Sequence, residues 1–193
     1  MTEPLKHILL FPGAFNPPHL GHLAALESAV RELYCDEIWI MPSGNHPDKE
    51  IGISYEDRRA MGELFVAEIE ERLDIPTRLI TTELDDSAGR PTAEIMRELK
   101  SQTGIELTQL IGADGYEALG EVGRADERFI VMPRSGYELP TLEDDSETII
   151  IEGTESNISS TRIRELVAAG DKAYEELLPY AIAEYITQHK LYG

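Results

Sequence analysis

The chain has 193 residues, 41% of them hydrophobic, which favours one domain over residues 1–193 with one sizeable core. Its formal net charge of −20 argues against long nucleic acids and membranes as partners, because most of the surface would repel both. No apolar run approaches the roughly 20 residues that span a bilayer, and the start of the chain does not resemble a secretory signal. Cys35 is the single cysteine, so a reducing, cytoplasmic location is expected. The oligomeric state stays open, a homo-oligomer included.

The predicted elements alternate between strand and helix along the chain. Short apolar runs bounded by turn residues predict strands at 7–11, 37–41, 77–83, 107–111, 128–132 and 148–151. Apolar residues at helical spacing predict helices at 20–34, 55–73, 92–101 and 160–169. A last helix is expected to carry on one face Leu178, Ala181, Ile182, Tyr185 and Ile186. This order predicts an α/β fold, a Rossmann-like doubly wound parallel sheet.

The segment from Gly13 to His22 lies where the first strand turns into the first helix. In a parallel sheet this is the carboxyl end of a strand, where ligands usually bind. Small residues let a phosphate approach the backbone, and a helix N-terminus offers free N–H groups. His19 and His22 are three residues apart, so both rings can face one anion. Alternatives are a tight loop with capping histidines or a metal site, although two histidines without nearby Cys or acidic partners make weak zinc ligands.

A second motif covers residues 157–164 at the start of another predicted helix, after the strand at 148–151. Hydroxyl groups and two arginines, Arg162 and Arg164, gather in its first turn. Capping needs only one hydroxyl, and a first turn normally favours acidic residues because of the helix dipole. Arginines there oppose the dipole unless an anion offsets them, so the motif predicts an anion site, with a capped surface helix as the alternative.

Together these motifs resemble the nucleotidyltransferase superfamily, with its paired-histidine and Ile-Ser-Ser-Thr-x-Ile-Arg signatures, and more closely the nicotinate-mononucleotide adenylyltransferases. The resemblance implies a fold of the nucleotidyltransferase type and runs nearly end to end. It is carried by further segments at 41–42 with 46–49, 58–61, 91–93, 110–114, 133–137, and 177–179 through Leu191 and Tyr192. Where the family usually has a tryptophan after its Gly-x-Asp turn, this chain has Tyr116 to Gly120.

The resemblance implies an enzyme of NAD biosynthesis that transfers AMP from ATP to nicotinate mononucleotide, forming deamido-NAD and pyrophosphate. The implied catalytic residues are His19, His22 and Arg164. The implied ATP-binding residues are Gly13, Ala14, Phe15, His19, His22, Lys49, Gly112, Asp114, Ile158, Ser160, Thr161 and Arg164. The implied acceptor-binding residues are Asn16, Thr92 and Arg134. Mg²⁺ is expected to arrive with ATP, so no metal site built by the protein is expected.

Other readings remain open at this point. The acceptor or donor could instead be that of another enzyme of the superfamily, with nicotinamide mononucleotide, phosphopantetheine or a CTP-dependent substrate. A non-catalytic nucleotide-binding sensor with the same fold is a different class of protein.

Overall fold

A computed structural model describes most of the chain, namely residues 5–44, 52–85, 92–101, 104–124, 127–134, 136–141, 147–151 and 158–193. Its strands form one parallel sheet in the order β3-β2-β1-β4-β5-β6. The strands are β1 (Lys6–Gly13), β2 (Glu37–Pro42), β3 (Thr77–Leu79), β4 (Ile105–Gly112), β5 (Arg128–Met132) and β6 (Thr148–Ile150). The order reverses direction between β1 and β4, as expected for a doubly wound Rossmann-like sheet. The predicted fold class is confirmed.

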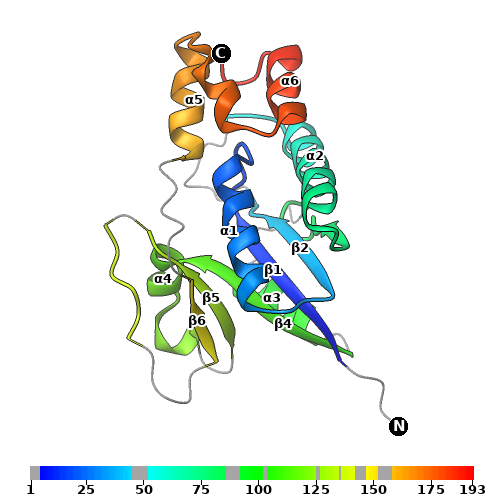
Figure 1. Cartoon of the computed structure of the whole chain (residues 1–193), viewed down its shortest axis with the longest axis vertical. Helices are drawn as coiled ribbons and strands as arrows, with labels where there is room; N and C mark the ends of the chain where they lie inside the picture. Colours follow the sequence, from blue (N-terminus) through cyan, green and yellow to red (C-terminus); the bar gives the residue numbers. More distant parts are fainter. Residues whose placement is uncertain are drawn as a thin grey trace.

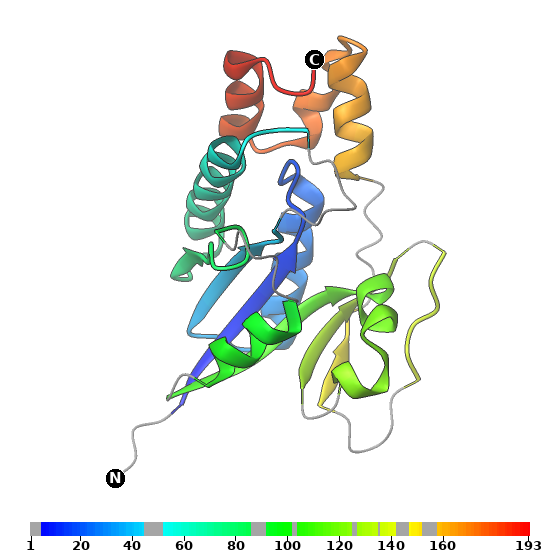
Figure 2. The ribbon, with the colours of Figure 1, turned by 180° about the vertical axis from the view of Figure 1, so that it is seen from behind.

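Helices cover both faces of this sheet. They are α1 (Leu20–Glu32), α2 (Tyr55–Leu73), α3 (Thr92–Lys100), α4 (Ala113–Arg124), α5 (Ser160–Ala168) and α6 (Tyr180–His189), with a 3₁₀ helix η1 (Lys172–Leu177) between the last two. Helix α1 lies in front of the sheet in Figure 1, whereas α3 and α4 lie in front of it when the molecule is turned round in Figure 2. The C-terminus lies beside α5 and α6. Within the described ranges, no helix is long and apolar enough to cross a membrane.

Two cores follow from the alternation of side chains along the central strands. Successive residues of a strand point to opposite faces of the sheet. Leu9 and Phe11 of β1 pack in the larger cluster with residues of α1, α2, α5 and α6, whereas Ile8 and Leu10 pack with residues of α3. Strands that are buried on both faces have nearly continuous apolar sequences, which explains why the central strands could be predicted from the sequence.

The structure corrects several predicted boundaries. The strand predicted at 77–83 ends at Leu79, because Thr81 donates from its hydroxyl to Asp85 and accepts the Asp85 N–H at its carbonyl, forming a turn. Helix α4 was not predicted, because its glycines weaken the helical pattern, and Gly120 (φ 62°) kinks it. The 3₁₀ helix η1 was not predicted either. The last helix begins at Tyr180, so Leu178 precedes it instead of lying on its face.

Candidate active site

Several of the predicted site residues lie where the sheet reverses its strand order. The loop after β1, the end of β4 and the segment after β5 are neighbours, because these three strands are adjacent in the sheet. The first residues of α5 join them through hydrogen bonds to the β1–α1 loop. Two motifs about 140 residues apart in the sequence therefore form one site, at the position where open α/β sheets bind ligands.

The β1–α1 loop is held by side chains that bind its carbonyl oxygens. The Arg58 guanidinium of α2 donates to the carbonyls of Ala14 (3.1 Å) and Ser43 (2.5 Å). From α5, Arg164 donates to the Asn16 carbonyl (2.8 Å) and Ser160 donates to the Pro17 carbonyl (2.9 Å).

These bonds also orient the donors of the loop. The Ser43 N–H bonds the Gly13 carbonyl (2.8 Å), and Arg58 bonds the Ala14 carbonyl. In a trans peptide the carbonyl and the following N–H point in opposite directions. The N–H groups of Ala14 and Phe15 are therefore directed away from Ser43 and Arg58.

Phe15 is implied as an ATP contact by the resemblance, and in the structure its side chain is buried. The residue has a positive φ of 45°, which is rare without glycine and costs free energy. Its ring is buried against Phe65 and His22, with ring centroids 5.9 and 4.9 Å away. A Cβ on Gly13 would lie 3.2 Å from this ring, so the absence of a side chain there lets Phe15 fold back into the core.

The two histidines are stacked on each other at the start of α1. Their ring centroids are 3.6 Å apart with an interplanar angle of 20°. His19 is the N-cap residue and only 5% exposed, and its N–H donates to Nδ1 of His22 (3.1 Å). Because Nδ1 of His22 accepts this bond, the proton of the neutral His22 ring must be on Nε2. His22 is thus oriented as an Nε2–H donor.

Burial keeps both imidazoles neutral. It lowers the pKa of His19 from 6.5 to about 4, with a further contribution from the positive charge of Arg134. Burial, followed by the charges of His19 and Arg134, lowers the pKa of His22 well below its usual range. Within the described part of the chain, Nδ1 of His19 is buried without a hydrogen-bond partner. An unpaired buried polar atom costs free energy, as is common where a ligand completes the site.

The helix starts at the site have an unusual charge pattern. Neither α1 nor α5 has an acidic residue in its first turn, whereas α2 has Glu56 and Asp57 there. In α5, Arg164 donates to the hydroxyl oxygen of Thr161 (3.2 Å) as well as to the β1–α1 loop. A guanidinium has five N–H donors, so these bonds leave donors for an anion. Both helix N-termini therefore suit a negatively charged ligand.

The Gly112-x-Asp114 segment connects β4 to α4. The Asp114 carboxylate occupies the space that a Cβ at position 112 would need, so the glycine lets this side chain fold back over the end of β4. Asp114 also lies 3.9 Å from Nε of Arg134, the half-exposed cation that acts on both histidines. Predicted residues at the start of α4, after β5 and at the start of α1 thus belong to one electrostatic environment.

Three other expected residues have different outcomes. Lys49 lies outside the described residues, and Thr92 begins α3 but its side chain is outside the described part. Ile158 is half-buried and packs against the larger core. Where the family usually has a tryptophan, the Tyr116 ring packs edge-on against Phe129 (5.2 Å), and the Arg124 guanidinium lies 4.7 Å from its centroid.

Sequence reasoning did not assign Arg58 and Tyr192 to the site. Arg58 is 2% exposed, and it precedes Met61 and Phe65 at helical spacing on the buried face of α2. The position of a charged residue on the apolar face of the predicted helix could have indicated that this arginine is buried. Tyr192 donates its hydroxyl proton to Oδ1 of Asn16 (2.6 Å), a contact between residues 176 apart that no local pattern predicts.

The side chains at this site suit phosphate better than a directly bound metal ion. Among the described residues there is no group of three or more His, Cys, Asp or Glu that could hold a metal ion. The two imidazoles and Arg164 are nitrogen donors, whereas Mg²⁺ prefers oxygen ligands. This donor set fits a polyphosphate that brings its own cation.

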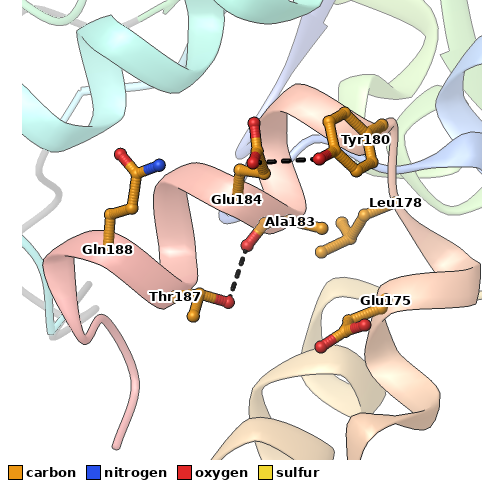
Figure 3. Close-up of a pocket in the computed structure, with 7 residues that line it drawn as sticks. All are labelled: Glu175, Leu178, Tyr180, Ala183, Glu184, Thr187 and Gln188. Carbon is orange, nitrogen blue, oxygen red and sulfur yellow. Dashed lines mark hydrogen bonds between the residues drawn. The ribbon is translucent and has the colours of Figure 1, made fainter.

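A separate groove of about 340 Å³ lies between η1 and α6. Figure 3 shows its lining residues, Glu175, Leu178, Tyr180, Ala183, Glu184, Thr187 and Gln188. None of the predicted site residues is among them. Its acidic rim would repel a phosphate, so the groove is distinct from the candidate site described above.

Comparisons with known proteins identify the family of the chain. The cytidylyltransferase-like family model matches residues 10–166. A probable nicotinate-nucleotide adenylyltransferase of Halalkalibacterium halodurans is 32% identical over 97% of this chain and 92% of its own length. One of Shouchella clausii is 34% identical over 98% of both.

Solved structures show the same fold. The Plasmodium falciparum nicotinic acid mononucleotide adenylyltransferase complexed with NaAD superposes with a TM-score of 0.77 at 17% identity, over 97% of both chains. A putative nicotinate-nucleotide adenylyltransferase from Vibrio parahaemolyticus gives a TM-score of 0.65 at 20% identity, over 95% of this chain and 99% of its own. By its family match and its full-length relatives, this chain belongs to the cytidylyltransferase-like family and to the nicotinate-nucleotide adenylyltransferases.

Proposed function

We propose that this protein transfers AMP from ATP to nicotinate mononucleotide, with deamido-NAD and pyrophosphate as products. The observation that carries this proposal is the stacked, neutral histidine pair at the start of α1, joined through one loop to the start of α5. The names of the full-length relatives support the acceptor, as does the NaAD in the Plasmodium falciparum complex.

The reaction needs one displacement at phosphorus. A 5′-phosphate oxygen of the acceptor attacks the α-phosphorus of ATP, and the bond to the bridging oxygen breaks as pyrophosphate leaves with the electron pair. Catalysis of such a transfer depends mainly on positioning and on stabilising charge at the phosphates. Mg²⁺ enters as part of the ATP substrate and neutralises charge on its phosphates.

The proposed ATP-binding residues form two main groups, one at the start of α1 and one at the start of α5. His22 Nε2–H and His19 donate to the α- and β-phosphates, next to the loop N–H groups of residues 13–15. A neutral donor does this without a protonation step near pH 7. Ser160, Thr161 and Arg164 hold the β- and γ-phosphates, with Lys49 assisting. Gly112, Asp114 and Ile158 line the adenosine side.

The acceptor residues are Asn16, Thr92 and Arg134. Nicotinate mononucleotide differs from nicotinamide mononucleotide in having a carboxylate where the other has a neutral amide. Arg134 is a cation close enough to the histidines to lower the pKa of both, so an anionic acceptor group in that space is favoured. A charge-assisted bond of about 1.5–3 kcal/mol corresponds to a preference of roughly ten- to a hundredfold in kcat/KM.

The test is pyrophosphate release with MgATP and each mononucleotide in parallel. Nicotinate mononucleotide should be the better substrate, and Arg134→Gln should reduce the preference. Arg59→Gln, an exposed arginine of α2 paired with Glu63, should preserve it. Equal efficiencies would reject the nicotinate assignment but not adenylyl transfer. Activity only with CTP or phosphopantetheine would identify another enzyme of the superfamily, and binding without turnover would identify a sensor.

A further inference from the structure

The penultimate residue, Tyr192, returns from the end of α6 to the β1–α1 loop. After His189 the chain turns sharply, because Lys190 is left-handed (φ 52°) and the Leu191 N–H bonds back to the Ile186 carbonyl (3.1 Å). Tyr192 itself has a positive φ of 63°. A left-handed tyrosine is unfavourable, so its contacts must stabilise this turn of the tail.

The contact it makes is with the side chain of Asn16. The Tyr192 hydroxyl donates to Oδ1 of Asn16 at 2.6 Å, and Asn16 is only 7% exposed. Burial raises the pKa of the Tyr192 phenol above its usual range, so the group stays protonated as a donor.

This bond fixes the orientation of the Asn16 amide. The oxygen and nitrogen of a primary amide differ in role, since one accepts and the other donates. With the oxygen bound to a phenol O–H, the NH₂ group is directed to the other side of the amide. Without the phenol, this constraint on the amide oxygen is lost.

We propose that Tyr192 is a positioning residue for the acceptor and acts through the Asn16 amide. This inference rests on the proposed function, in which Asn16 contacts the acceptor mononucleotide. Tyr192 orients the amide so that its NH₂ group meets the anionic acceptor. The C-terminal residues thereby contribute to a site that begins at residue 13.

Other bonds hold the backbone of this loop independently of Tyr192. Arg164 binds the Asn16 carbonyl, Ser160 binds the Pro17 carbonyl, and Arg58 binds the Ala14 carbonyl. Removing the phenol oxygen therefore leaves the loop and the histidine pair in place. The effect should fall on the acceptor and spare ATP, which separates positioning from a general structural role.

The experiment compares Tyr192→Phe with the wild type in steady-state kinetics of pyrophosphate release. Loss of one neutral hydrogen bond should raise the KM for nicotinate mononucleotide about threefold to tenfold, with the KM for MgATP and the Tm unchanged. The matched control is Tyr174→Phe. It removes another buried phenol of the C-terminal region, bonded to Thr187 at 2.8 Å, and should leave both KM values unchanged.

A double-mutant cycle tests whether the effect passes through Asn16. Asn16→Ala should raise the acceptor KM, and adding Tyr192→Phe should change it no further. Additive effects, an unchanged acceptor KM in Tyr192→Phe, or a parallel rise in the KM for ATP would overturn the inference while the proposed function stands. If the wild type itself is inactive with nicotinate mononucleotide, the proposed function fails and this inference fails with it.

Discussion

Protonation of the buried His19 should destabilise the fold as the pH falls below neutrality. The folded protein has a His19 pKa of about 4, against 6.5 for an exposed imidazole. The unfolded chain therefore takes up the proton first as the pH falls. Stability that is fully present above about pH 6.5 is lost progressively between about pH 6.5 and pH 4.

The size of the effect follows from the two pKa values. At about pH 5 the unfolded His19 is almost fully protonated and the folded one hardly at all, which corresponds to a loss of about 2 kcal/mol. Below the folded pKa the loss approaches about 3 kcal/mol. His22, whose pKa is also lowered, adds to it in the same direction.

The assay is urea unfolding at about pH 7.5 and about pH 5, for the wild type and for His19→Asn. Asparagine is a favourable N-cap residue and does not titrate, so the variant keeps the helix start but loses this pH dependence. Protonation of carboxylates also changes stability, but equally in both proteins, so the difference reports His19 together with its influence on the pKa of His22. An equal loss in wild type and His19→Asn would refute the reasoning.

Two further substitutions test the catalytic donor and the loop tether. His22→Ala should lower kcat about 10²- to 10³-fold and affect the KM for ATP far less, as measured by initial rates on folded protein, and an unchanged kcat would exclude His22 from the mechanism. Arg58→Met should lower the unfolding free energy by about 1–2 kcal/mol in urea titrations, because the part-buried hydrogen bonds from the guanidinium to the carbonyls of Ala14 and Ser43 are lost. Unchanged stability would show that the loop holds its shape without the arginine.

The fold was predictable where local and tertiary preferences agree. Helix α2 begins and ends at the predicted residues. Ser54 caps it by accepting the Asp57 N–H, and left-handed Asp74 ends it. Helix α4 was missed because its glycines disfavour a helix locally, and packing of Ala113 and Leu119 against β5 outweighs that preference.

The same distinction applies to the candidate site: residues in continuous sequence motifs could be predicted, whereas residues that join it through long-range contacts could not. The histidines and the α5 start lie in continuous motifs whose helix-terminal positions indicate anion binding. Arg58 and Tyr192 act through contacts 44 and 176 residues apart along the chain. The shape of the loop that they bind exists only in the folded molecule, so no sequence window contains this information.

The distribution of charge explains how a chain of net charge −20 can offer a site for polyanions. At the start of the strands, Glu37 pairs with Lys6 and Arg78, and Glu106 pairs with Arg128. These ion pairs occupy the amino edge of the sheet, whereas the helix N-termini face its carboxyl edge. Exposed charges are screened over about 8–10 Å, but a partly buried phosphate interacts strongly with donors in contact with it. Local donors therefore determine binding at this site. The acidic surface acts mainly on longer polyanions, because these extend beyond the site and contact that surface.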